Sequence, residues 1–254
     1  MGSRVSVQDL IRTERESFKM RTKILYEDED ILVVRKPAGI AVQTGHIGQQ
    51  DVESELKNYL SKASGSTGGS PYLGIIHRLD QPVEGLLVFA KNKKAAAALS
   101  AQLTAGDFCK EYAAVVLGGP DRKQEEGTLI NFLTKTGNRA LITDTAESTD
   151  AKRAVLRYTK LADAVVEGEK ISLLRIRLET GRFHQIRAQL SFAGMPILGD
   201  RAYGSSESLA FSENQGITRL ALCAGHLIFN HPVTGAEMEY RTDSDNPAFS
   251  IFDV

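Results

Sequence analysis

The chain has 254 residues, of which 42% are hydrophobic and 25% are charged, and its formal net charge is −1. This length can bury the core of one large domain or of two subdomains, and the composition is ordinary for a soluble globular protein. No stretch approaches the roughly 18 apolar residues of a membrane span, and the first twenty residues are too polar for a secretory signal, so we expect a cytoplasmic protein.

Neither the charge balance nor the pattern of cysteines and histidines points to a nucleic-acid-binding or a metal-binding protein. A near-neutral chain is not a strongly basic nucleic-acid-binding domain, although a local positive groove remains compatible with it. Cys109 and Cys223 are too few for a disulfide framework or a cysteine-based zinc site. The five histidines show no metal-binding spacing, so the sequence predicts no metal site.

The first half of the chain alternates between apolar runs and helical patterns. Residues 1–22 are expected to form an extension with a short helix at 7–11. Apolar runs predict strands, and apolar positions at helical spacing or an Ala-rich run predict helices. The predicted strands are 31–34, 73–76, 86–89 and 110–117, the predicted helices are 51–62 and 93–103, and 64–71 is a predicted Gly/Ser-rich loop.

The second half is richer in strands. We expect strands at 152–159, 171–178 and 219–229, a helix over 183–194, and a hairpin turn at 232–235. Strands outnumber helices, and there is no steady alternation of strand and helix. The sequence therefore predicts an α+β fold with a mixed, mainly antiparallel sheet and flanking helices.

The segment His77-Arg78-Leu79-Asp80 places one acid between two apolar, strand-like runs. A carboxylate in such surroundings must be paired, hydrogen-bonded or protonated, because burying a bare charge is very costly. Arg78 and Asp80 share a face if the chain is extended there. The pattern alone favours a structural ion pair over a catalytic acid, because most acids in such surroundings serve structure.

Two other segments carry candidate functional side chains. In Thr180–Arg187, Gly181 can open a helix that places His184 and Arg187 one turn apart near its start. With Arg182 beside it, this helix start is suited to bind a phosphate or a carboxylate. Lys110-Glu111-Tyr112 opens a strand with an aromatic ring that can stack on a flat ligand.

In chain order, five segments resemble RluA-type pseudouridine synthases of the RsuA/RluA superfamily. They are YEDEDILVVRKPAG, HRLD with GLLVFAK, KEYAAVV, TGRFHQIRAQL and HLIFNHPVTG, and they span roughly residues 23–241. The resemblance implies the pseudouridine-synthase catalytic fold, with two subdomains around a central cleft. It implies a catalytic domain over 23–254, preceded by an extension, 1–22, too short for the S4-type RNA-binding domain of many relatives.

The resemblance also implies a reaction and its residues. The protein would isomerise uridine in structured RNA to pseudouridine, without a cofactor or metal, after extruding the nucleotide into a pocket. Asp80 would be the catalytic carboxylate, Tyr112 would lie against the base and handle the proton at C5, and Arg187 would keep Asp80 ionised. Attack at C1′, attack at C6 and a glycal route all remain open.

The RNA contacts implied by the resemblance are less specific. Arg78, Arg182, His184 and Lys91 are the candidate RNA-binding residues, although each can also serve structure alone. The partner would be a stem-loop of ribosomal or transfer RNA, recognised by its shape and an unstacked base. Nothing in the chain argues against a monomer.

The chain departs from the family pattern near the acid. Val83-Glu84 replaces the usual Thr-Ser pair, Phe183 replaces a small polar residue, and Cys223 stands where His is frequent. None of these departures removes a residue assigned to catalysis, so we expect activity. Two other functions stay open: a catalytically silent RNA-binding module, and a nucleoside hydrolase using Asp80 with Glu84 as the second carboxylate.

Overall fold

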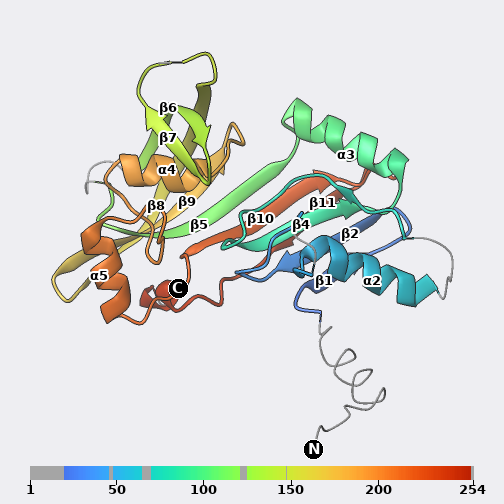
Figure 1. Cartoon of the computed structure of the whole chain (residues 1–254), viewed down its shortest axis with the longest axis horizontal. Coiled ribbons are helices and arrows are strands. Elements are labelled where there is room, and N and C mark those ends of the chain that lie inside the picture. The colour runs from blue at the N-terminus through green and yellow to red at the C-terminus, as the bar shows by residue number, and fades with distance from the viewer. Residues whose placement is uncertain (1–19, 46–47, 65–69, 121–124, 147, 253–254) are drawn as a thin grey trace, which may run out of the picture.

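One large sheet forms the centre of the molecule. The computed structural model describes residues 20–45, 48–64, 70–120, 125–146 and 148–252, and its eleven described strands join in a single sheet (Figure 1). The main path follows the order β1-β2-β4-β10-β5-β9-β8-β6-β7, with β3 paired to β4 and β11 paired to β10. The strands are β1 Lys23–Glu27, β2 Ile31–Lys36, β3 Gly74–Ile75, β4 Glu84–Ala90, β5 Cys109–Leu117, β6 Glu126–Thr136, β7 Arg139–Thr143, β8 Lys152–Val166, β9 Glu169–Leu178, β10 Leu222–Asn230 and β11 Glu237–Arg241.

The strand pairs are antiparallel except for one short parallel contact between β4 and β10. There Glu84 lies opposite Cys223 and Gly85 lies opposite Ala224. Gly85 has φ +130°, and a Cβ atom at this position would lie 2.4 Å from the carbonyl oxygen of Ala224. Glycine is therefore required at the point where the two strands approach.

Helices cover the two ends of the sheet (Figure 1). Beside the strands β1 to β4 lie α2 and α3, and α4 and α5 lie near β6 to β9. The helices are α2 Val52–Ser64, α3 Lys93–Ala105, α4 Gln185–Phe192 and α5 Ser206–Asn214, with a 3₁₀ turn η1 over Pro247–Ile251.

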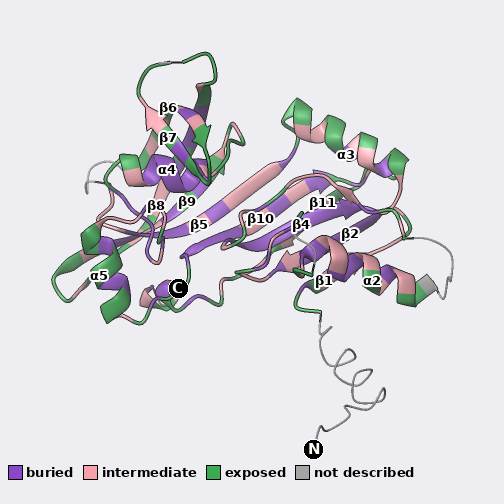
Figure 2. Ribbon diagram, in the orientation of Figure 1, coloured by how far each residue is buried: buried purple, intermediate pink, exposed green. Residues whose placement is uncertain are grey.

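The core encloses β4 on both faces, and Figure 2 shows this strand buried along its length. Leu87 and Phe89 pack in one cluster with Leu56 of α2. Leu86 and Val88 pack in a second cluster that contains Leu99 of α3. Because alternate side chains of a strand point to opposite faces, a continuous apolar run is what a strand covered on both faces requires.

The expectation of a mixed, mainly antiparallel α+β fold is confirmed. The hairpin turn at 232–235 is also confirmed, since it joins the antiparallel pair β10–β11. The sequence analysis missed β1, the hairpin β6–β7, α5 and β11, and it ended β8 too early, because that strand continues to Val166. In β6 only Asn131 and Leu133 are buried, so this strand lacks the apolar run that marks the central ones.

The short helix expected at 7–11 and most of the Gly/Ser-rich loop expected at 64–71 lie outside the described residues. Among the residues that are described, no helix is both long and apolar enough to cross a membrane.

Candidate active site

Asp80 lies on a tight turn between β3 and β4. The backbone N–H of Val83 donates to the carbonyl oxygen of Asp80 at 3.0 Å, and the buried side chains of Leu79 and Val83 anchor the turn in the core. The Asp80 side chain itself remains 26% exposed. The alternation of apolar and polar residues thus holds a carboxylate at the edge of the core while leaving it accessible to a ligand.

Arg187 on α4 is the cation beside this acid. Its Nη1 lies 3.4 Å from Asp80 Oδ2, while its Nε and Nη2 donate to the two oxygens of Asp200 at 2.8 and 2.7 Å. Burial disfavours the charge on Arg187, but its hydrogen bonds to Asp200 and the charges of Asp200 and Asp80 outweigh that cost and raise its pKa. Arg187 is therefore fixed by Asp200 and presents its remaining nitrogen to Asp80.

The sequence analysis paired Arg187 with Asp80 and missed the stronger partner. Asp200 is 2% exposed and also accepts hydrogen bonds from the backbone N–H groups of Ala202 and Tyr203. The sequence did contain a signal for this pair, because Asp200 is the one acid in a stretch that holds several arginines. Which arginine Asp200 contacts, however, depends on the turn after α4.

His184 approaches Asp80 from the start of α4. Its Nε2 lies 3.6 Å from Asp80 Oδ2, and its Nδ1 lies 3.0 Å from the hydroxyl of Tyr203. That hydroxyl accepts from the backbone N–H of Ala140, so its own proton can go to Nδ1, which leaves Nε2–H facing Asp80. Burial lowers the pKa of His184, and its φ of 54° is a strained conformation of the kind found at functional sites.

The side chain of Gln185, in the segment Thr180–Arg187, shapes the turn into α4. The Oε1 atom of Gln185 accepts from the backbone N–H of Arg182 at 2.9 Å and from the hydroxyl of Thr180 at 2.8 Å. Its amide nitrogen donates to the carbonyl oxygen of Val155 at 3.0 Å. These bonds tie the helix start to β8 and so fix the direction in which Arg187 projects.

Tyr112 of β5 completes the group around Asp80. It is 8% exposed and lines the same open groove, whose volume is about 1360 Å³. Burial and the charge of Asp80 raise the pKa of Tyr112 well above its ordinary value, so the ring enters any reaction as a neutral phenol. An aromatic ring that lines the groove beside a carboxylate can hold a planar base.

The groove contains five of the other predicted site residues and excludes one. Arg78 and Arg182 are exposed and line it, together with Asp80, His184 and Arg187. Lys91 lies outside its lining: the ammonium group forms an ion pair with Glu27 at 2.7 Å and also donates to the carbonyl oxygen of Asp28. The structure therefore gives Lys91 a contact that holds β4 to β1.

Glu84 does not provide the second carboxylate that a hydrolase would need. It is 2% exposed, it contacts Arg35 at 3.5 Å and the hydroxyl of Ser244, and it is absent from the groove lining. Burial, followed by the charge of Glu84, raises the pKa of the neighbouring Cys223 thiol to about 12, so that thiol is unreactive.

Phe183, the other departure from the family pattern, does lie in the groove. Its ring stacks on the imidazole of His184 with centroids 3.8 Å apart, and the ammonium group of Lys135 lies 4.8 Å from its centroid. The aromatic substitution therefore extends the flat wall of the groove beside His184.

Lys36 is a residue whose importance the sequence analysis missed. It is fully buried, and its Nζ donates to the carbonyl oxygens of Pro37, Ile40 and Gln81 at 3.0, 2.7 and 3.0 Å. Gln81 directly follows Asp80, so Lys36 clamps the turn that carries the acid. The sequence signal for this role was the position of Lys36, between an apolar strand and a turn that contains Pro and Gly.

The ionisation of Lys36 makes stability depend on pH. Burial lowers its pKa from 10.5 to about 7, although the charge of Asp80 opposes the shift. Between these values the unfolded chain binds a proton that the folded chain has lost, so the free energy of unfolding should rise with pH, by at most about 1.4 kcal/mol per unit. Urea unfolding of wild type and Lys36→Met between about pH 7 and pH 10 measures this, and equal slopes for both proteins would contradict it.

The geometry of the groove suits an enzyme that acts on a nucleotide of a nucleic acid. A partly exposed carboxylate, a fixed guanidinium and a neutral aromatic ring meet in a groove that exposed arginines border. Such a groove suits a polyanion carrying a planar base, and the carboxylate can act on that base or its sugar.

Comparison with known sequences gives the family. Residues 30–192 match the sequence model of a family described as RNA pseudouridylate synthase. Ribosomal large subunit pseudouridine synthase D of Zymomonas mobilis is 35% identical over 226 residues, covering 87% of this chain and 68% of that protein. The protein of the same name from Vibrio cholerae is 34% identical, and the match covers 94% of this chain and 73% of the Vibrio protein. The chain belongs to the RNA pseudouridylate synthase family.

Solved structures agree at the level of the fold. Human RNA Pseudouridylate Synthase Domain Containing 4 superposes with a TM-score of 0.71 at 22% identity, covering 90% of this chain and 92% of that one. The resemblance to RluA-type enzymes is thus confirmed, and the protein is an isomerase that converts uridine in RNA to pseudouridine.

Proposed function

We propose that Asp80 is the catalytic carboxylate of this isomerase and acts on a uridine extruded into the groove. The observation that carries the proposal is the contact between Asp80 and Arg187, in which Asp200 fixes the guanidinium and the acid stays partly exposed. An adjacent cation favours the ionised acid, which is the form needed for a base or a nucleophile.

The reaction assigns distinct tasks to the residues around Asp80. The bond between N1 and C1′ breaks, the uracil turns, and a bond forms between C5 and C1′. C5 then loses its proton, and N1 takes up a proton. Tyr112 lies against the base as a neutral phenol, and His184 directs Nε2–H toward Asp80. Attack at C1′, attack at C6 and the glycal route all use the same carboxylate.

We propose a uridine of large-subunit ribosomal RNA, in a stem-loop, as the substrate, because the relatives from Zymomonas mobilis and Vibrio cholerae are named for that subunit. Incubating unmodified ribosomal and transfer RNA with the protein and mapping new pseudouridines tests this. New sites in large-subunit RNA are expected. Sites in transfer RNA alone would refute the substrate, release of free uracil would indicate a hydrolase, and no product would indicate a silent module.

The arginines at the groove are proposed to bind the phosphates beside the extruded nucleotide. Arg78→Gln and Arg182→Gln should each weaken RNA binding for any sequence and reduce the slope of log affinity against log salt by about 0.7 to 0.9. Fluorescence anisotropy of labelled RNA at several salt concentrations measures this slope. Lys91→Gln is the matched control, since Lys91 lies outside the groove, and an equal change there would place the RNA elsewhere.

The remaining expectations stay proposals. We propose that residues 23–254 form the catalytic domain, that the protein acts as a monomer, and that it works in the cytoplasm. The ribosomal substrate of the named relatives supports the last of these.

A further inference from the structure

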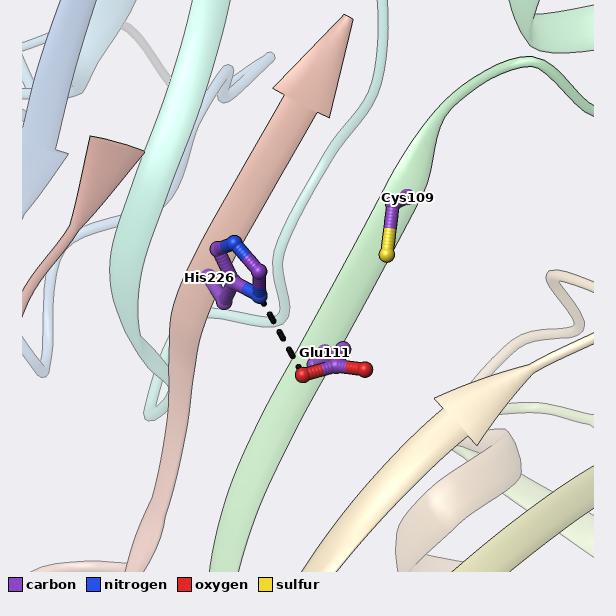
Figure 3. Close-up of side chains that lie close together, drawn as sticks. All are labelled: Cys109, Glu111 and His226. Carbon is purple, nitrogen blue, oxygen red and sulfur yellow. Dashed lines mark hydrogen bonds and ion pairs between the residues drawn. The ribbon is translucent and has the colours of Figure 1, made fainter. Parts of the chain in front are cut away.

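A cluster of three metal-ligating side chains lies on the central strands, outside the groove. Cys109 and Glu111 project from β5 and His226 projects from β10 (Figure 3), and their ligand atoms all lie within 4.8 Å of one another. Glu111 and His226 are directly opposed in the sheet. Because Tyr112 is the next residue after Glu111 on the strand, the cluster lies on the other face of β5.

The hydrogen bonds of His226 place it between two carboxylates. Its Nε2 lies 2.8 Å from Glu239, and its Nδ1 lies 3.2 Å from Glu111. A neutral imidazole has a single N–H, so when Nε2 donates to Glu239, a lone pair on Nδ1 faces the oxygen of Glu111. Two hydrogen-bond acceptors in contact repel each other unless a positive charge lies between them. That charge is either a second proton on the imidazole or a metal ion.

The third side chain favours a metal. Cys109 adds a sulfur ligand on the same side, and sulfur, imidazole and carboxylate together are a ligand set typical of zinc. A metal-bound histidine usually donates its other N–H to a carboxylate, and Glu239 occupies that position. Arg241 in turn holds Glu239 through contacts of 2.7 and 3.0 Å.

We propose that Cys109, Glu111 and His226 bind one Zn²⁺ ion through Sγ, a carboxylate oxygen and Nδ1. A water molecule can complete the tetrahedron, because all three side chains are only partly buried. Binding forms the Zn–S bond and releases the thiol proton to solvent. The ion ties β5 to β10 behind Tyr112 and takes no part in the isomerisation.

A second cluster illustrates what such a site needs. Asp28, Asp30 and His231 also lie close together. The Nδ1 of His231, however, accepts from the backbone N–H groups of Val233 and Thr234, and its Nε2 lies 2.9 Å from Asp28. Backbone donors therefore already occupy the lone pair of Nδ1, unlike that of His226, and this cluster is a hydrogen-bond network that supports the hairpin turn.

Cobalt titration of the metal-free, tag-free, reduced protein tests the proposal. One equivalent of Co²⁺ per chain should bind and give a thiolate-to-cobalt charge-transfer band in the near ultraviolet, and Zn²⁺ should displace it. Cys109→Ser should abolish the band, while Cys223→Ser, the matched control, should retain it. Glu239→Gln should weaken binding by about 10- to 100-fold, since Glu239 only orients the imidazole.

Four outcomes would overturn the proposal. A wild-type protein that shows no thiolate band has no metal site at these residues. A band that survives in Cys109→Ser, or one that disappears equally in Cys223→Ser, would place the metal on another residue. If Cys109→Ser fails to fold by circular dichroism, Glu111→Gln replaces it, with a weakened Co²⁺ affinity as the expected result and an unchanged affinity as the contrary one.

Discussion

Asp80→Asn is expected to bind RNA and form no pseudouridine. The substitution keeps the size of the side chain and removes its charge, so the loss in kcat/KM should be on the order of 10³-fold or more. Stability should change little, by about 1 kcal/mol at most, because Arg187 keeps its two hydrogen bonds to Asp200 and Asp80 is partly exposed. The measurement is single-turnover pseudouridine formation on the mapped substrate.

Glu84→Gln is the matched control for Asp80→Asn, because it neutralises a carboxylate four residues away that lies outside the groove. It should retain the activity of the wild type once the folded fraction is accounted for. Activity of Asp80→Asn equal to that of the wild type would refute the assignment of Asp80. A comparable loss in Glu84→Gln would show that the second carboxylate takes part after all.

Asp200→Asn is expected to be the most destabilising change near the site. The amide oxygen can still accept from the backbone N–H groups of Ala202 and Tyr203, so the change removes mainly the charge that faces Arg187. A buried guanidinium without its bidentate partner should cost about 3–5 kcal/mol in the free energy of unfolding. Urea unfolding measures this loss, and pseudouridine formation should also fall, since Arg187 is no longer fixed.

A double variant separates the structural role of this pair from its role in the site. Arg187→Met with Asp200→Asn removes both charges, and it should recover much of the stability because no unpaired buried charge remains. It should not recover activity, because Asp80 then lacks its cation. Recovery of both properties would mean that the pair supports the fold alone.

The central elements were predictable from sequence because their burial leaves a strong pattern. The run Leu86-Leu87-Val88-Phe89 is continuous and apolar because β4 is covered on both faces. The hairpin β6–β7 has no such run, since its strands are exposed on alternate positions and are held by pairing with β8. Propensity alone cannot reveal a strand whose stability comes from its neighbours.

The site was predictable where its residues lie within a motif. Asp80, Tyr112 and Arg187 were all named from short segments, and the structure brings them to one groove. Asp200 and Lys36 were missed because their partners are set by turns. The contact between Glu111 and His226 was missed for a different reason: it spans 115 residues and exists only because β5 pairs with β10.

The continuity of the sheet has a consequence for how the substrate is chosen. Hydrogen-bonded strands run without a break from β1 to β7, so the walls of the groove cannot swing apart as separate bodies without breaking strand pairs. We therefore expect the enzyme to act as a rigid template, so that the distortion needed for binding takes place in the RNA. Uridines that are already weakly stacked, in loops and bulges, are the ones that can adopt the required shape at low cost. Substrate choice would thus reflect the local pliability of the RNA as much as its sequence.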